Sequence, residues 1–138
     1  MTTYESDIKT ISSSEEVVFG ILSDLNNLEK LNNTPSLTDK IKDLKFDVDS
    51  CTFSVDGFGK VGFRILERNP FNLIKMVSEN APIRVSMEFV ICGIAENQST
   101  LKLVLLAELP AMIKMMVGNK LQDGVNAIAE LLAKTLNQ

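Results

Sequence analysis

The sequence contains few residues able to carry out catalysis, and their spacing does not indicate an acid–base pair. The chain of 138 residues contains no histidine, so an acid or base would be a carboxylate, a lysine or the single tyrosine, Tyr4. Asp49, Asp56 and Glu67 stand near the ends of strand-like segments, where solvated charge is the usual explanation. Because no two carboxylates share the apolar face of a predicted strand, the sequence favours a non-catalytic protein, with an enzyme as the alternative.

The two cysteines do not indicate a metal site. Cys51 and Cys92 are far apart, belong to no CxxC motif and have no histidine to join them, so neither a metal nor another cofactor is expected. Each falls within a strand-like run, where a free cysteine is usually a small buried hydrophobe. We therefore expect both thiols to be reduced and buried.

Composition and charge favour a globular protein that does not bind nucleic acid. The formal charge of −4 and the lack of a Lys/Arg cluster exclude nucleic acid as an expected partner. Residues 1–14 lack the features of a signal peptide, and no apolar run reaches the length of a membrane span, so a cytoplasmic protein is expected. With 45% hydrophobic and 23% charged residues, residues 1–138 are predicted to form one globular domain.

The N-terminal third predicts one strand followed by short helices. A polar strand is expected over Thr3–Ile11, with Tyr4, Ser6 and Ile8 on one face. Ser13 and Glu16 form a capping box for a helix over Ser14–Asp24. Two further helical segments are predicted; they are Asn26–Leu31 and a turn or two opened by Thr34 and Pro35 that runs through Leu37 and Ile41.

From Leu44 the apolar period changes to two, which predicts an antiparallel meander. The expected strands are Leu44–Asp49, Cys51–Val55, Phe58–Glu67, Asn72–Glu79, Ile83–Ile94 and Thr100–Glu108. Turn residues separate several of them, at Asp56-Gly57, Arg68 to Pro70, Asn80 to Pro82 and Glu96 to Gln98.

One face of this meander is almost wholly apolar. Its members are Phe53, Val55, Val61, Phe63, Ile65, Val85, Met87, Phe89, Ile91, Leu101, Leu103 and Leu105. The opposite positions carry Lys60, Arg64, Arg84, Ser86, Glu88 and Lys102. Such alternation predicts a sheet with one buried side, which another element must cover.

The covering element is predicted to be a long C-terminal helix over Ala111–Leu136. Pro110 stops the last strand, and apolar residues then recur at spacings of three and four. At about 1.5 Å per residue the helix would be some 39 Å long, enough to cross the sheet. Gly118 and Gly124 interrupt it and favour a bend or a close approach to a strand.

This order of elements resembles that of the START-like superfamily, which includes polyketide cyclase-like proteins and lipid-transfer domains. The most specific local likeness runs from Ile11 through Ser12, Ser13, Ser14, Glu15 and Glu16 to Leu25. The resemblance implies an α+β helix-grip fold: a seven-stranded curved antiparallel sheet wrapped round the C-terminal helix, with two or three short helices between strands one and two. The chain departs from the family in lacking tryptophan and in its aliphatic inward face, which counts against cyclase activity.

The resemblance also implies a cavity between the sheet and the N-terminal half of the long helix. We expect it to take a small apolar molecule, lipid-like or polyketide-like, without catalysis; the alternative is a cyclase or dehydratase acting on a polyketide-like substrate. The expected lining is Phe53, Phe63, Ile65, Met87, Phe89, Leu103, Leu105, Met112, Met115 and Met116, with Lys120 at the mouth to pair with a ligand carboxylate. The sequence leaves open whether these residues line a pocket or only fill the core.

A third hypothesis concerns the outward side of the sheet. Val90, Cys92, Val104 and Leu106 fall there on adjacent strands and would form an exposed apolar patch, which favours a homodimer or a protein partner. A register shift or a bulge in either strand would remove the patch.

Overall fold

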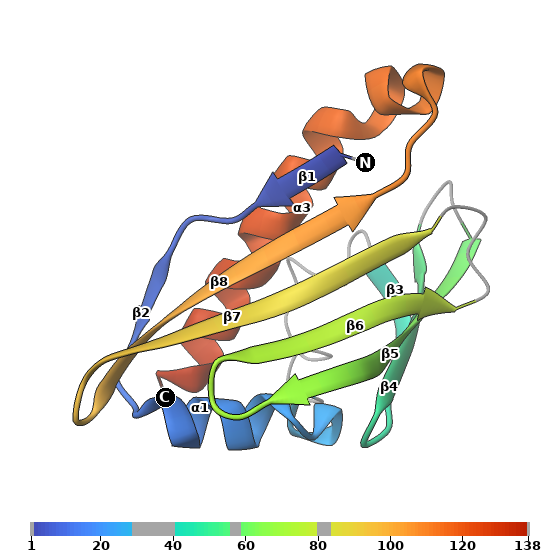
Figure 1. Cartoon of the computed structure of the whole chain (residues 1–138). Coiled ribbons are helices and arrows are strands. Elements are labelled where there is room, and N and C mark those ends of the chain that lie inside the picture. The colour runs from blue at the N-terminus through green and yellow to red at the C-terminus, as the bar shows by residue number, and fades with distance from the viewer. Residues whose placement is uncertain (1, 29–40, 56–58, 80–83, 138) are drawn as a thin grey trace.

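One antiparallel sheet and a long C-terminal helix dominate the computed structural model, which describes residues 2–28, 41–55, 59–79 and 84–137 (Figure 1). The strands are β1 Thr2–Glu5, β2 Lys9–Ile11, β3 Ile41–Phe46, β4 Ser50–Val55, β5 Gly59–Asn69, β6 Leu73–Glu79, β7 Val85–Ala95 and β8 Gln98–Ala107. Their order across the sheet is β1-β8-β7-β6-β5-β4-β3, with β2 also paired to β8. The helices are α1, Glu15–Leu22, and α3, Ala111–Leu136. The α+β architecture and the meander are thereby confirmed.

The first predicted strand is divided in two, and Ile8 does not share a face with Tyr4 and Ser6. The amide of Asp7 donates to Asn126 Oδ1 of α3 at 3.0 Å instead of to a strand. This bond interrupts the pairing with β8 between β1 and β2. The alternation is lost at the break, and Ile8 is consequently 66% exposed.

Strand β3 lies earlier than the sequence predicts. Ile41, expected in a short helix, begins the strand, and Asp47 to Asp49 form a turn rather than its end. In that turn the Asp47 amide donates to the Ser50 carbonyl at 2.8 Å, and Asp47 Oδ1 accepts from the Val48 amide at 2.8 Å. An aspartate that bonds nearby backbone in this way competes with strand pairing.

Helix α1 begins one residue later than predicted and ends at Leu22 rather than Asp24, and its cap is Ser14 and not Ser13. The Ser14 side chain accepts from the Val17 amide at 3.3 Å, while the Ser13 carbonyl accepts from Ser99 Oγ at 2.9 Å. After α1, a short 3₁₀ turn spans residues 25–28 and buries Leu28. The rest of the two predicted short helices, including Leu31, Thr34, Pro35 and Leu37, lies outside the described residues, as do the predicted turns at Asp56-Gly57 and Asn80 to Pro82.

The two helices cover the inward face of the sheet, which we define as the side that packs against α1 and α3. Helix α1 packs against β6, β7 and β8, and α3 packs mainly against β8, β1 and β2. The bounds of α3 are those predicted from the sequence. Neither described helix has an apolar stretch of the length that a bilayer crossing requires.

Two amide side chains of α3 and that of its C-cap, Asn137, fasten the helix to the N-terminal segment. Besides Asn126, Gln122 Nε2 donates to the Glu5 carbonyl at 2.8 Å, and Asn137 Oδ1 accepts from the Ser12 amide at 2.7 Å. From Gln122 to its C-cap, α3 is therefore held along the β1–β2 side of the sheet by hydrogen bonds as well as by apolar packing.

Candidate binding site

The inward face is built from rows of side chains that strand register places opposite one another. One row runs across five strands and contains Tyr4, Leu105, Met87, Met76 and Ile65. Directly opposed residues of an antiparallel pair project from the same face. The row therefore keeps the predicted alternation, although the register shifts elsewhere, between Lys42 and Lys45 in β3 and between Ile65 and Glu67 in β5. The row brings together three of the residues expected to line a site.

Burial changes along the inward face. At the end of the sheet nearest α1, which we call the core end, Ile74, Ile91, Leu101 and Leu103 are all at most 2% exposed. Toward the other end, inward residues pack against the core but stay partly exposed; five of them, Phe46, Phe53, Val61, Val85 and Met87, are called the open end here. Of the predicted lining residues, Phe63, Ile65, Phe89, Leu103 and Leu105 are buried, whereas Phe53 and Met87 belong to the open end.

Aromatic stacking and a desolvated thiol mark the β4–β5 part of this face. The rings of Phe53 and Phe63 stack with centroids 6.0 Å apart. Cys51 lies opposite Phe63 in the register, and its burial raises the pKa of the thiol from 9.0 to about 11, although a backbone hydrogen bond with Phe63 lowers it slightly. Cys51 is partly exposed, so the expectation that it is buried holds only in part, and Cys92 is exposed, so the expectation is wrong for Cys92.

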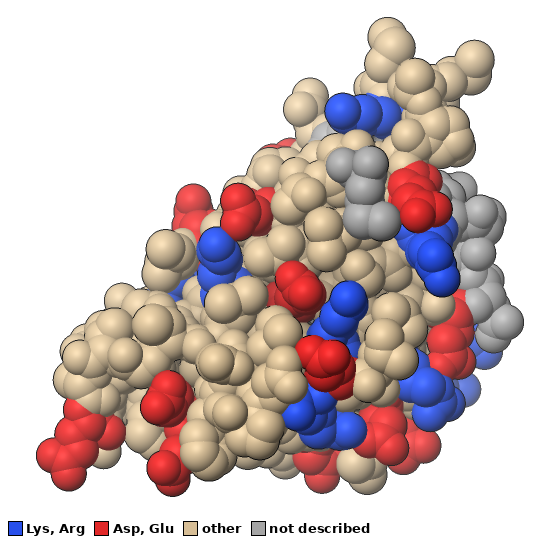
Figure 2. All heavy atoms as spheres, viewed as in Figure 1, with Lys and Arg blue, Asp and Glu red and all other residues tan. Residues whose placement is uncertain are grey.

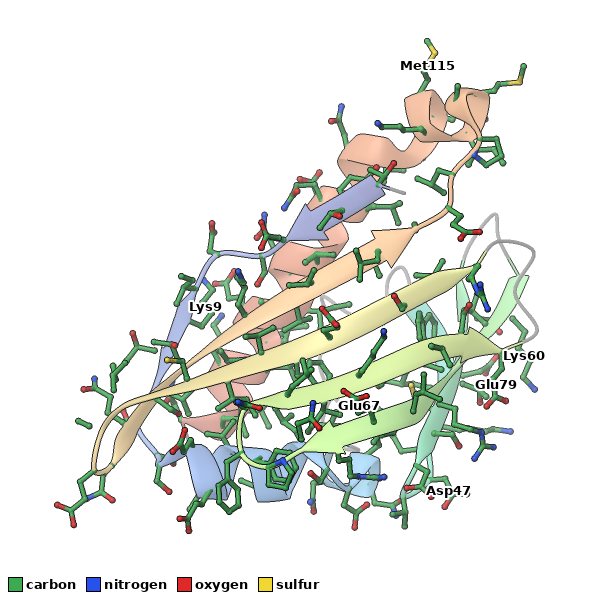
Figure 3. All side chains as sticks on the ribbon, in the orientation of Figure 1. Lys9, Asp47, Lys60, Glu67, Glu79 and Met115 are labelled. Carbon is green, nitrogen blue, oxygen red and sulfur yellow. The ribbon has the colours of Figure 1, made fainter. Side chains whose placement is uncertain are left out.

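The three methionines of α3 do not lie over the sheet. Met112, Met115 and Met116 are 75%, 88% and 71% exposed, and the first turns of α3 extend past the end of β8, with Met115 pointing away from the molecule (Figures 1 and 3). Helical phase explains the exposure of Met116, which lies nine positions before the buried Val125, about two and a half turns, and so on the opposite face. Lys120 is exposed on the same side. The sequence placed all four residues at the cavity; the structure places them in solvent.

Tyr4 contributes a polar atom to the inward face that the expected site residues did not include. Its side chain is 8% exposed, and its hydroxyl is buried with no hydrogen-bond partner in the described structure. The other two buried polar residues among those described, Ser6 and Ser99, are hydrogen-bonded, whereas Ser23 Oγ at the end of α1 is a second buried oxygen without a partner there. Strand alternation placed Tyr4 on one face with Ser6 but did not say which face is inward. Pairing of the first strand with β8 is what would have identified Tyr4 as an inward residue.

Arg68 lies at the core end, where its guanidinium forms a hydrogen bond and an ion pair. Its guanidinium donates to the Ser23 carbonyl at the end of α1, at 2.9 Å, and also pairs with Asp49. A cation that bonds the last carbonyls of a helix satisfies acceptors that the helix leaves unpaired. Arg68 therefore fastens α1 to the sheet.

A separate surface hollow of about 500 Å³ lies where α1 begins, against the β7–β8 turn. Its lining includes three glutamates, Glu15, Glu16 and Glu96. Gly93 allows the approach of Glu15, since a Cβ there would lie 2.9 Å from the Glu15 carboxylate. This open, acidic hollow differs in chemistry from the apolar inward face.

The outward apolar patch is interrupted by charge. Val104 is 9% exposed and lies between Glu5 and Glu88 in the register, and Val90 lies opposite Lys102. Lys102 Nζ pairs with Glu5 at 2.8 Å. Acidic and basic side chains are mixed over this side of the molecule (Figure 2). The register holds as predicted, but no continuous patch results; whether the chain forms a dimer stays a hypothesis.

Known proteins resemble this chain in fold but do not match it in sequence. No family model and no curated protein matches the sequence. Solved structures do match: norcoclaurine synthase from Thalictrum flavum, truncated, has a TM-score of 0.74 at 9% identity, covering 99% of this chain and 91% of its own. A START superfamily protein from Mycobacterium smegmatis has a TM-score of 0.55 at 16% identity, with coverages of 94% and 98%. The chain has the START-like helix-grip fold.

Two further matches extend this comparison. An HSP90 activator from Plasmodium falciparum has a TM-score of 0.55 at 18% identity, with coverages of 80% of this chain and 76% of that one. Another structure of the Thalictrum synthase, with a TM-score of 0.72 at 11% identity and coverages of 96% and 86%, contains dopamine and hydroxybenzaldehyde. At these identities the likeness establishes the START-like fold, and the role of this chain must be argued from its own residues.

Proposed function

We propose that the chain binds a small, mainly apolar molecule against the open end of the inward face, between the sheet and α3, without catalysing a reaction. One observation carries the proposal. The inward side chains are mainly apolar, yet those of the open end remain partly exposed while those named at the core end are at most 2% exposed. A sheet that only needed a core would gain stability by burying both ends.

The position of α3 accounts for this difference. The helix packs mainly along β8, β1 and β2, and its first turns project beyond the sheet (Figure 1). Apolar side chains left partly uncovered forfeit dispersion contacts and remain in contact with water. A ligand placed against Phe53, Val85 and Met87 would restore those contacts, which is a general source of affinity in apolar sites.

The fold comparison supports the proposal by analogy. The Thalictrum synthase structure that contains dopamine and hydroxybenzaldehyde shares this fold at 11% identity. Small aromatic molecules can therefore be accommodated by a protein of this architecture, although the chemistry of each site depends on its own residues.

The direct test is titration with the neutral fluorescent probe N-phenyl-1-naphthylamine, together with native mass spectrometry of protein purified from cells. We expect probe fluorescence to rise on binding, and Met87→Lys to weaken binding at least tenfold, or roughly 1.4 kcal/mol, because a charge would enter the apolar site. Ser86→Lys is the matched control, since Ser86 is the neighbouring residue of β7 on the outward face.

Circular dichroism establishes that both variants fold. Binding that survives Met87→Lys unchanged would place the probe elsewhere, and a wild-type protein that binds no apolar probe would contradict the proposed function. A bound apolar molecule seen in native mass spectra would identify the natural ligand class.

A further inference from the structure

The hydroxyl of Tyr4 is a buried polar atom on the inward face to which the described residues supply no hydrogen-bond partner. Tyr4 is the single tyrosine of the chain, and it is 8% exposed. Its hydroxyl is shielded from solvent and finds no partner in the described structure. Buried tyrosine hydroxyls usually find a partner, because an unmade hydrogen bond leaves the desolvation cost uncompensated.

Register places this hydroxyl beside the proposed binding surface. Tyr4 of β1 is opposite Leu105 of β8, which is in turn opposite Met87 of β7. Neighbouring strands are about 4.8 Å apart, so the Cα atoms of Tyr4 and Met87 are separated by only about 10 Å. Because β1 lies at one end of the strand order and Tyr4 is only 8% exposed, another element must cover its side chain.

Helix α3 closes the solvent side of Tyr4. The helix packs against β1, and Gln122 Nε2 donates to the carbonyl of Glu5, the residue after Tyr4. That bond holds one turn of α3 over the strand. The hydroxyl therefore lies between sheet and helix, where a water molecule has few other polar groups to bond.

We propose that the Tyr4 hydroxyl donates a hydrogen bond to a neutral oxygen, a carbonyl or a hydroxyl, of the bound molecule. The inference rests on the proposed binding function and specifies its ligand class: an apolar body with one uncharged hydrogen-bonding oxygen. A phenol can donate or accept, and donation to oxygen gives its stronger bond.

The surrounding charges favour a neutral ligand. A buried carboxylate needs a cation close by. Lys120 is exposed on the side of α3 away from Val125, and Arg68 is engaged by Ser23 and Asp49. Among the described residues no charged side chain is buried. An anionic ligand would therefore lack a counter-charge at this surface, contrary to the role that the sequence suggested for Lys120.

A pair of isosteric probes tests the inference. 2-Acetylnaphthalene carries a ketone where 2-isopropenylnaphthalene carries a methylene group, so the two differ in one hydrogen-bond acceptor. We expect the wild-type protein to bind the ketone about three- to tenfold more tightly than the hydrocarbon. In Tyr4→Phe we expect the two affinities to become equal, with the hydrocarbon bound as before.

A second measurement detects the hydrogen bond directly. The carbonyl stretching frequency of bound 2-acetylnaphthalene should fall below its value in hexane in the wild-type protein, and should return toward that value in Tyr4→Phe. The ligand-free Tyr4→Phe protein should melt at the same temperature as the wild type or higher, because the substitution removes an unpartnered buried hydroxyl.

The outcomes separate this inference from the function on which it rests. If both naphthalenes bind with equal affinity and the carbonyl frequency matches hexane, the role of Tyr4 is wrong and the apolar site stands. A Tyr4→Phe protein that melts markedly lower without ligand would show that the hydroxyl has a structural partner, and would also overturn the inference. If neither naphthalene binds, the proposed function fails with it.

Discussion

The two cysteines should differ sharply in reactivity. Burial raises the pKa of Cys51 from 9.0 to about 11, whereas Cys92 is exposed. Because the thiolate is the nucleophile, we expect Cys51 in a Cys92→Ser protein to react slowly with iodoacetamide near neutral pH. Its rate should rise with pH until about 11. Cys92 in a Cys51→Ser protein should react much faster.

The same shift fixes the direction of a stability change. The folded pKa of Cys51 lies above the unfolded value of 9.0, so its contribution to the free energy of unfolding is complete below pH 9. The contribution is lost as pH rises from 9.0 to about 11. Urea unfolding of wild type and Cys51→Ala across this range measures the loss. Equal reactivity of both thiols in the folded chain would contradict the assignment.

Single residues show what the sequence could and could not predict about the site. Alternation placed Phe63, Met87 and Leu105 inward because period-two burial is a local property. The apolar character of Met116 says nothing about its helical face, and the phase set by Val125 puts it in solvent. Whether the Tyr4 hydroxyl finds a partner depends on where α3 docks, which is a tertiary property that no local pattern contains.

The N-cap residue of helix α1, Ser14, should contribute measurably to the stability of the protein. Ser14 accepts from the Val17 amide, one of the donors that a helix start leaves unpaired. Ser14→Ala should therefore lower the free energy of unfolding by about 1 kcal/mol, measured by urea denaturation. Ser13→Ala is the matched control. Ser13 is linked to Ser99 through its backbone carbonyl, so its removal should change stability by less than about 0.5 kcal/mol. A larger loss of stability in Ser13→Ala than in Ser14→Ala would support the capping box predicted from Ser13 and Glu16 instead.

Elements were predictable to the extent that local signals determine them. The bounds of α3 follow from Pro110 and from an unbroken helical period, and they match. The first strand did not match, because Asn126 captures the Asp7 amide across more than one hundred residues of sequence. Strand β3 shifted because Asp47 bonds its own turn. In both cases a side chain bonded to backbone overrode the apolar pattern.

At the scale of the whole molecule, stability should be graded along the sheet. The core end near α1 is fully buried, whereas the open end has partly exposed side chains. Regions with fewer buried apolar contacts open more easily. We therefore expect the open end to unfold locally more often than the core end, which connects the packing of α3 to the proposed function.

Hydrogen exchange tests this gradient and its response to ligand. We expect amides of β8 and the C-terminal half of α3 to be the most protected, and those of β4 and the start of β7 to exchange faster in ligand-free protein.

2-Acetylnaphthalene at a hundred times its dissociation constant should stabilise the folded state by about 2.7 kcal/mol. The added protection should be largest in β4, around Phe53, and at Val85 and Met87, with little change around α1. Met87→Lys should abolish it and Ser86→Lys should not. Protection that instead increased around Glu15 and Glu96 would move the binding site to the acidic hollow, and unchanged exchange everywhere would contradict binding at the open end.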